Sequence, residues 1–307
     1  MEQTEIDRIV TEVAALTREH YVFPEAGEKI ATQLSEQHVA GRYDAIAGPA
    51  DLAELVTGDL QAVNGDKHLR LLFRPEGVAD EADPAEHLAA MTAEARDTAG
   101  GMARVELLDG NVGYLAIRPA LFPPSIAGAQ AAAALSLLAD ARALVLDLRE
   151  CRGGSPDMVA LICGYLFDEP THLGDIVGRD PEDRRQFWTA DRVEGRRFGG
   201  RKPVFVLTSG TTFSGAEDLS YSLQQCGRAT VIGRRTGGGA HPRRGFKLHP
   251  QLEATISVAR SEHPVTKSNW EGTGVVPDVE TPAEEALEVA YRLATEQPGE
   301  KVVAAAR

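Results

Sequence analysis

The chain has 307 residues, of which 43% are hydrophobic and 25% are charged, and its formal net charge is −14. These values are typical of a globular protein with a large core, and an acidic balance without a basic stripe argues against a nucleic-acid partner. Three widely spaced cysteines indicate neither a disulfide framework nor a zinc site. The amino terminus lacks the pattern of a secretory signal, and no apolar run is long enough to span a membrane. We therefore expect a cytoplasmic protein, although a chain trimmed of its leader would look the same.

Residues 1–75 predict a small helical bundle that ends in a short strand. Hydrophobic residues recur at helical spacing over 6–16, and two further helices are expected at 26–38 and 49–63. The strand is expected at 69–73, with His68 at its start. Residues 76–101 are polar and mixed in composition, and we interpret them as a connector between domains.

Residues 102–307 predict a second domain in which strands and helices alternate. Its first two strands flank Asp109-Gly-Asn111, which is a typical hairpin turn. Strand–helix–strand units of this length indicate parallel strands joined by helical crossovers. The segment 168–200 is expected to be irregular. The remaining strands are predicted at 143–148, 203–207 and 229–233, and the helices at 126–141, 156–167, after Ser214 and at 282–295.

Ser214 lies at the turn between a buried strand and a helix, which is the geometry that a serine nucleophile needs. The same residue begins Ser-Gly-Ala-Glu217, which has the form of a capping box. Capping serines far outnumber catalytic ones, so this segment alone favours the cap. The two roles are compatible, and the other motifs of the chain must decide between them.

Four further motifs occur in a fixed order around this serine. Gly153-Gly154 follows a strand and precedes a helix, so its amides can face a cavity. A glycine-rich loop, 233–241, follows another strand and ends at His241, and Glu271 begins Glu-Gly-Thr-Gly-Val-Val-Pro-Asp. Earlier in the chain, Asp66-Lys-His68 precedes the first predicted strand.

This ordered set of motifs resembles the tail-specific, C-terminal processing serine peptidases. The similarity covers about residues 60–280 and is strongest to the branch of tricorn protease, nisin-resistance protein and the repeats of interphotoreceptor retinoid-binding protein. It implies an α/β fold with a ClpP/crotonase-like core of strand–helix units and an amino-terminal helical bundle. It also implies hydrolysis of peptide bonds, near carboxyl termini in some members, without cofactor or metal. No room exists for a PDZ module between residues 75 and 105.

The resemblance assigns the catalytic roles by position. Ser214 would be the nucleophile. Members with a Ser–Lys dyad have a lysine in the glycine-rich loop, but none of the six lysines of this chain lies there. His68 would therefore be the base. Glu271 matches the acidic member of the tricorn-type site. Asp66 is a second residue that could orient His68, and His241 is the rival base or a residue lining the substrate.

The oxyanion hole would combine the amide of Gly215 with that of Gly153 or Gly154. Arg152 stands where the family often has asparagine, which puts the neighbouring contacts in doubt.

Two other functions remain open at this point. The main alternative is a catalytically idle relative that binds a hydrophobic ligand such as a retinoid or a fatty acid. The second is an acyl-CoA enzyme of the crotonase type, which shares the fold but uses backbone amides without a serine. For the peptidase we expect a peptide or protein substrate and no membrane span, and the resemblance is compatible with a homo-oligomer.

Overall fold

The computed structural model describes residues 1–44, 46–78 and 84–296. The chain divides into two compact units. Unit 1 comprises residues 1–88, 176–185 and 241–261, and unit 2 comprises 89–175, 186–240 and 262–307. The connector predicted at 76–101 includes residues 79–83, and the predicted second domain includes 297–307; both stretches lie outside the described residues. The predicted domain boundaries stay a prediction.

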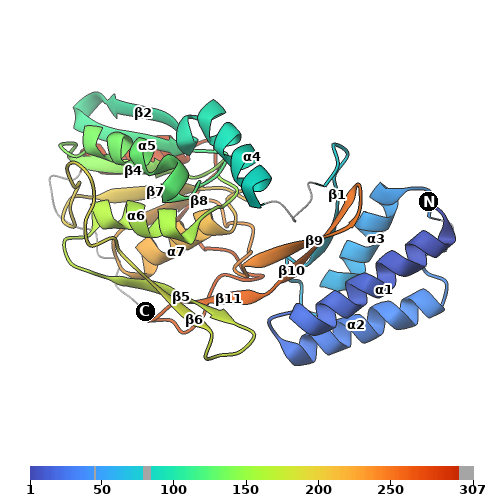
Figure 1. The fold of residues 1–307 in the computed structure, drawn as a ribbon. Helices are drawn as coiled ribbons and strands as arrows, with labels where there is room; N and C mark the ends of the chain where they lie inside the picture. Colours follow the sequence, from blue (N-terminus) through green and yellow to red (C-terminus); the bar gives the residue numbers. More distant parts are fainter. Residues whose placement is uncertain (45, 79–83, 297–307) are drawn as a thin grey trace. The chain divides into compact units, whose positions relative to one another are not determined.

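Three helices form the amino-terminal part of unit 1, as the hydrophobic spacing indicates (Figure 1). They are α1 (Gln3–His20), α2 (Pro24–Val39) and α3 (Pro49–Gln61). A proline at the start of α2 and of α3 occupies the first turn, where its missing N–H costs no hydrogen bond. The buried face of α1 contains Ile6, Ile9 and Val13, each at most 1% exposed.

A three-stranded antiparallel sheet packs against these helices within unit 1. Its order is β1 (Arg70–Phe73), β10 (Leu252–Ser257) and β9 (Arg243–His249). Sequence analysis assigned no strand to residues 243–257. Leu252, Ala254 and Ile256 alternate along β10 and are fully buried, so this strand shares one hydrophobic core with the helices.

His68 precedes β1 by two residues and lies in a turn instead of on the strand itself. The Asp66 carboxylate accepts the His68 N–H at 2.9 Å, and the Asp66 carbonyl accepts the Leu69 N–H at 3.3 Å. These local bonds replace ladder bonds, because an aspartate side chain can cap the backbone two residues later.

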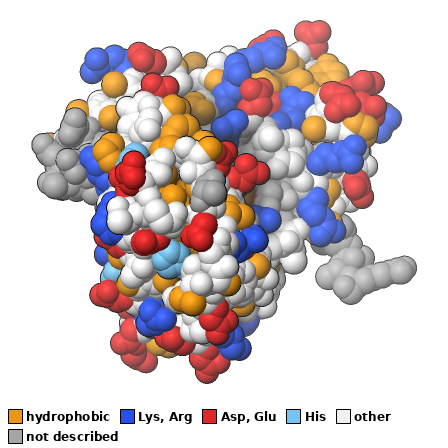
Figure 2. Space-filling view, turned by 90° about the vertical axis from the view of Figure 1, so that its right-hand side faces the viewer, with side chains coloured by type: hydrophobic (Ala, Val, Ile, Leu, Met, Phe, Trp, Pro, Cys, Tyr) orange, Lys and Arg blue, Asp and Glu red, His pale blue; other side chains and the backbone are white. Residues whose placement is uncertain are grey.

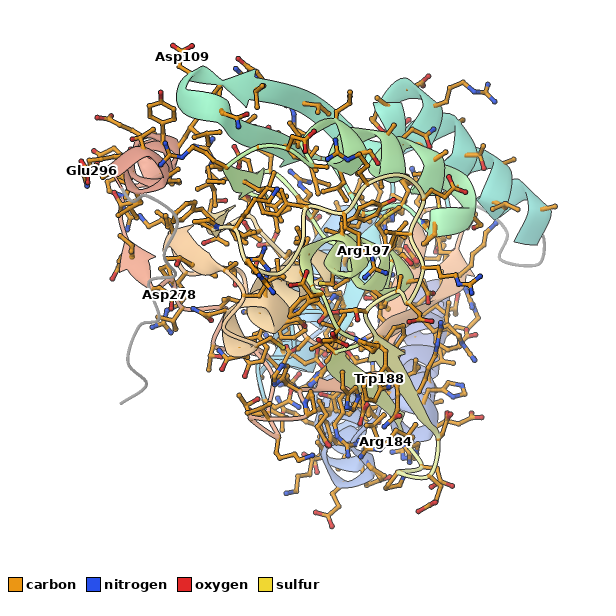
Figure 3. The ribbon with its side chains drawn as sticks, turned by 90° about the vertical axis from the view of Figure 1, so that its left-hand side faces the viewer. Asp109, Arg184, Trp188, Arg197, Asp278 and Glu296 are labelled. Atoms are coloured by element: carbon orange, nitrogen blue, oxygen red, sulfur yellow. The ribbon has the colours of Figure 1, made fainter. Side chains whose placement is uncertain are left out.

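Unit 2 is built around a six-stranded sheet of order β12-β8-β7-β4-β3-β2. The hairpin predicted at Asp109–Asn111 is present, and Asp109 lies at its tip (Figure 3). All other neighbouring strands are parallel, as the strand–helix alternation predicts. The strands are β2 (Met102–Leu108), β3 (Val112–Ile117), β4 (Ala143–Asp147), β7 (Val204–Thr208), β8 (Thr230–Gly233) and β12 (Val279–Glu280).

Helices cover both faces of this sheet. Along β4, Leu144 and Leu146 belong to one core, and Ala143 and Val145 belong to the other. The first core also contains residues of α5 (Pro124–Leu137), α6 (Pro156–Leu166) and α7 (Gly215–Gln225), whereas the second contains those of α8 (Ala286–Glu296). Burial on both faces explains why these strands are continuous hydrophobic runs. The remaining helices of this region are α4 (Pro84–Asp97) and the short η1 (Ala99–Gly101) and η2 (Asp109–Asn111).

The prediction of an irregular segment at 168–200 is wrong for two stretches. These form β5 (His172–Gly178) and β6 (Arg184–Trp188), which belong to a third sheet of order β11-β5-β6, with β11 at Ala259–Glu262. Four of the five residues of β6 are exposed and two of them are arginines, so its sequence lacks a hydrophobic strand pattern. A contact between the neighbouring strands β5 and β6 accompanies their pairing: the Trp188 ring stacks on the His172 ring with centroids 4.7 Å apart.

Among residues 1–44, 46–78 and 84–296, no helix is long and apolar enough to cross a membrane. On the face drawn in Figure 2, acidic and basic side chains are interspersed with hydrophobic ones.

Leu146 tests the contribution of the central strand to stability. Its side chain is fully buried in the sheet core, so Leu146→Ala should lower the free energy of unfolding by about 2–5 kcal/mol. Urea unfolding monitored by circular dichroism provides the measurement. Leu137→Ala is the control, because Leu137 is 76% exposed, and a change below about 0.5 kcal/mol is expected. Equal effects of both substitutions would contradict the assigned core.

Candidate active site

Ser214 lies in unit 2, at the turn between β7 and α7. Its backbone has φ of 53° and ψ of −121°, a conformation that residues with a side chain rarely adopt. Surrounding hydrogen bonds hold the turn: Thr212 Oγ1 donates to the Leu148 carbonyl at 2.9 Å, and Phe213 N–H donates to the Cys151 carbonyl at 3.2 Å. A strained serine in a strand-to-helix turn is the arrangement that exposes a nucleophilic hydroxyl.

The Gly153-Gly154 turn lies directly against Ser214. Both glycines have positive φ, 112° and 132°, and a Cβ on Gly153 would stand 2.7 Å from the Ser214 Cβ. Only glycine therefore fits this position without displacing the serine. The turn is fixed from its other side, because Leu121 N–H donates to the Gly153 carbonyl at 2.7 Å.

Three backbone amides lie around the serine. Within the described residues, the N–H groups of Gly153, Gly154 and Gly215 donate no hydrogen bond. Gly215 is the first residue of α7, where N–H groups have no partner inside the helix. These are the amides that the sequence assigns to an oxyanion hole.

Glu217 organises the site through a carboxylate that has no solvent exposure. It accepts the N–H of Ser214 at 2.8 Å, of Gly238 at 2.7 Å and of Gly239 at 2.9 Å, and also the hydroxyl of Thr236. Burial raises its pKa, and these four hydrogen bonds work in the opposite direction. The sequence pattern indicates only a capping box for Glu217; its contacts with the glycine-rich loop join residues about twenty positions apart and leave no local signal.

Glu271 contacts the other end of that loop. Its Oε2 accepts the Ala240 N–H at 2.5 Å, and the neighbouring Trp270 Nε1 donates to the Gly239 carbonyl at 2.8 Å. Residues 238–240 thus receive backbone contacts from two glutamates of unit 2. Within this unit, Glu271 positions the end of the glycine-rich loop through Ala240. Its predicted role toward His68 stays a prediction.

In unit 1, Asp66 holds the ring of His241. Asp66 Oδ2 is 2.8 Å from His241 Nδ1, and the carboxylate also accepts the hydroxyls of Tyr21 at 2.9 Å and Ser257 at 3.0 Å. Burial alone would raise the pKa of Asp66, but the hydrogen bond and charge of His241, together with Tyr21, lower it. An ionised Asp66 places the proton of a neutral His241 on Nδ1, which leaves Nε2 as the basic atom.

His68 also lies in unit 1, and it meets Asp66 through its backbone N–H, as described above. Its side chain is buried, and this burial lowers the pKa of the imidazole to about 4; the charge of Asp66 opposes the shift, and those of Arg243, His241 and Arg70 add to it. His68 is therefore neutral at physiological pH and can accept a proton.

Family models match most of this chain. The model described as "Peptidase family S41" matches residues 111–281, and the one described as "N-terminal domain of Peptidase_S41 in eukaryotic IRBP" matches residues 3–105. The chain therefore belongs to peptidase family S41. This confirms the family predicted from the ordered motifs, including the resemblance of the amino-terminal part to the retinoid-binding proteins.

Solved structures share the fold at low sequence identity. A putative peptidase from Parabacteroides merdae has a TM-score of 0.65 and 18% identity, covering 94% of this chain and 96% of that one. The photosystem II D1 C-terminal processing protease has a TM-score of 0.55 and 17% identity, with coverages of 98% and 100%. A putative S41 protease from Bacteroides fragilis has a TM-score of 0.54 and 20% identity; the match covers 64% of this chain and spans 58% of that one. The predicted α/β fold with its helical amino-terminal region is confirmed.

Glu217→Gln tests whether the buried carboxylate organises the site. A glutamine has a single acceptor oxygen and would direct an NH₂ group at N–H donors, so we expect a loss of about 2 kcal/mol or more in the free energy of unfolding. Thermal and urea unfolding measure this loss. Glu288→Gln is the matched control, because Glu288 is exposed on α8 and should tolerate the change. Similar stability of the two variants would remove Glu217 from its assigned role.

Proposed function

We propose that this protein is a serine-type peptidase in which Ser214 attacks a peptide carbonyl and forms an acyl-enzyme. The observation that carries the proposal is the strained backbone of Ser214, because a non-glycine residue keeps such a conformation only where its surroundings enforce it. Membership of family S41 supports the same chemistry.

Charge development in the transition state would be stabilised by backbone amides. The carbonyl oxygen becomes negative as the hydroxyl of Ser214 adds, and the N–H groups of Gly215 and of Gly153 or Gly154 are the donors proposed to receive it. Removing one such donor typically costs about 10²–10³ in rate. Because these amides belong to the same unit as Ser214 and lie beside it, they are preorganised for the reaction.

The proposed general base is His68, which takes the proton of Ser214 and later returns it to the leaving amine. Water then hydrolyses the acyl-enzyme, with His68 again as the base. Its low pKa supports the role in one respect, since the imidazole is unprotonated at neutral pH. The proposal requires the ring of His68 to come within hydrogen-bond reach of the Ser214 hydroxyl during turnover.

His241 is the rival base, and a specific contact favours it. Its Nδ1 bonds to the buried carboxylate of Asp66, which is how an acidic residue orients a catalytic histidine. If His68 is the base, the Asp66–His241 pair has a supporting role, and Glu271 is the acidic residue of the catalytic set. The proposed substrate is a peptide or protein, and cleavage near its carboxyl terminus is part of the proposal.

A fluorophosphonate probe tests the nucleophile. We expect the probe to label the wild-type protein and not Ser214→Ala, and hydrolysis of a casein-derived peptide mixture should disappear in parallel. Ser125→Ala is the control, because Ser125 is exposed at the start of α5 and should keep full labelling. Absence of labelling in the wild type, together with tight binding of a fluorescent fatty acid, would indicate a carrier.

The pH dependence of kcat/KM distinguishes the two histidines. If His68 is the base, its pKa of about 4 in the folded state means that activity falls on the acid side only as the pH approaches this value. His68→Ala should then abolish turnover while His241→Ala retains part of it. An acid limb well above this value would contradict His68 as the base, and a larger loss in His241→Ala than in His68→Ala would assign the role to His241.

A further inference from the structure

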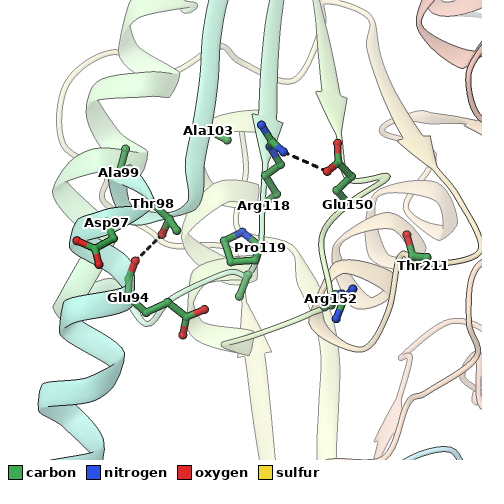
Figure 4. A pocket seen from close by; sticks show the side chains of 11 residues that line it. Glu94, Asp97, Thr98, Ala99, Ala103, Arg118, Pro119, Glu150, Arg152 and Thr211 are labelled. Atoms are coloured by element: carbon green, nitrogen blue, oxygen red, sulfur yellow. Dashed lines mark hydrogen bonds and ion pairs between the residues drawn. The ribbon is translucent and has the colours of Figure 1, made fainter. Parts of the chain in front are cut away.

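Unit 2 contains a cavity of about 850 Å³ beside the glycine turn (Figure 4). Its wall is formed by the carboxyl end of α4, the residues after β3 and the residues after β4. Five charged side chains line it: Glu94, Asp97, Arg118, Glu150 and Arg152. A cavity of this size is large enough for a few residues of a peptide.

Two lining residues of the cavity lie close in the sequence to the proposed reaction centre. Arg152, a lining residue, directly precedes Gly153, the glycine that packs against Ser214. Its backbone N–H donates to the Pro119 carbonyl at 2.8 Å, which fixes the start of the glycine turn. Thr211, also a lining residue, precedes Ser214 by three positions. The wall of the cavity and the glycine turn thus belong to one continuous segment of backbone.

The cations of the cavity differ in their partners. Arg118 forms an ion pair with Glu150 at 3.1 Å. Arg152 is exposed and, within the described residues, its guanidinium has no ion-pair or hydrogen-bond partner. Figure 4 shows Arg152 and Thr211 on one side of the cavity, and Glu94 and Asp97 on the opposite side. Arg152 is thus the cation of the cavity without a partner among the described residues, and Glu94 and Asp97 lie across the cavity from it.

We propose that Arg152 selects substrates by pairing with a carboxylate located a few residues from the scissile bond; this inference rests on the peptidase function proposed above. A guanidinium can bind a carboxylate through two parallel hydrogen bonds, which adds geometric selectivity to the charge attraction. The carboxylate can be the free carboxyl terminus of a peptide or the side chain of an aspartate or glutamate. Arg152 is then a specificity-determining residue of the site.

Four peptides with one scissile sequence test the proposal. The first has a free carboxyl terminus three residues beyond the bond, the second is its amide, and two longer amidated peptides contain Glu or Gln at that position. We expect kcat/KM of the wild type to be about tenfold higher for the first peptide than for its amide, or for the Glu peptide than for the Gln peptide; tenfold corresponds to ~1.4 kcal/mol. Whichever pair shows the preference identifies the source of the carboxylate.

Variants connect the preference to Arg152. Arg152→Gln should abolish it by lowering kcat/KM for the carboxylate peptide alone, and Arg152→Glu should reverse it. Arg292→Gln is the control, because Arg292 is exposed on α8 outside the cavity. No preference in the wild type, or an equal loss on all peptides in Arg152→Gln, would overturn the proposal.

A binding measurement separates this inference from the proposed function. Fluorescence anisotropy of the same labelled peptides with Ser214→Ala does not require turnover. A carboxylate preference in Kd that disappears in Ser214→Ala/Arg152→Gln supports Arg152 as the selecting residue even if Ser214 proves not to be the nucleophile. Equal Kd values for all four peptides in Ser214→Ala would contradict it even if hydrolysis is shown.

Discussion

The buried carboxylate of Glu217 holds the Ser214 turn and the glycine-rich loop together. A buried charge is tolerated only when donors replace the water it has lost, and here three backbone amides and a hydroxyl do so. Because these donors come from Ser214 and from residues 236–239, one side chain joins the start of α7 to the glycine-rich loop. Glu271 extends the connection to Ala240. The conformation of Ser214 is thus coupled to a loop that lies more than twenty residues later in the chain.

Unit 1 uses the same principle around Asp66. The carboxylate is 1% exposed and receives hydrogen bonds from Tyr21, Ser257, the ring of His241 and the backbone of His68. Each unit therefore prepares its own part of the proposed chemistry: one holds a strained serine with free amides, and the other holds two buried histidines around an ionised aspartate. Preparation inside a compact unit keeps side chains in fixed orientations, which is what acid–base catalysis requires.

The residues before Gly153 connect specificity with chemistry in the proposed mechanism. Arg152 directly precedes the glycine turn. The amides proposed for the oxyanion hole and the arginine proposed to select substrates therefore belong to one short segment. In the proposed mechanism, a substitution at Arg152 would change substrate preference while Gly153 keeps its contact with the serine.

Local patterns in the sequence predicted the amino-terminal helices, the hairpin at Asp109–Asn111 and the parallel strands, because hydrophobic spacing and turn residues act over a few positions. The order of the motifs along the chain predicted the family. Local patterns were insufficient for β6, which lacks a hydrophobic strand pattern, and for β9 and β10. Of these two, β10 pairs with β1, and this pairing joins segments about 180 residues apart. Likewise, Ser-Gly-Ala-Glu identified Glu217 as a cap but not as an anchor for Gly238. Only the tertiary structure decided that Asp66 would meet His241, because a hydrogen bond between residues 175 positions apart depends on how the chain packs and leaves no periodic pattern in the sequence.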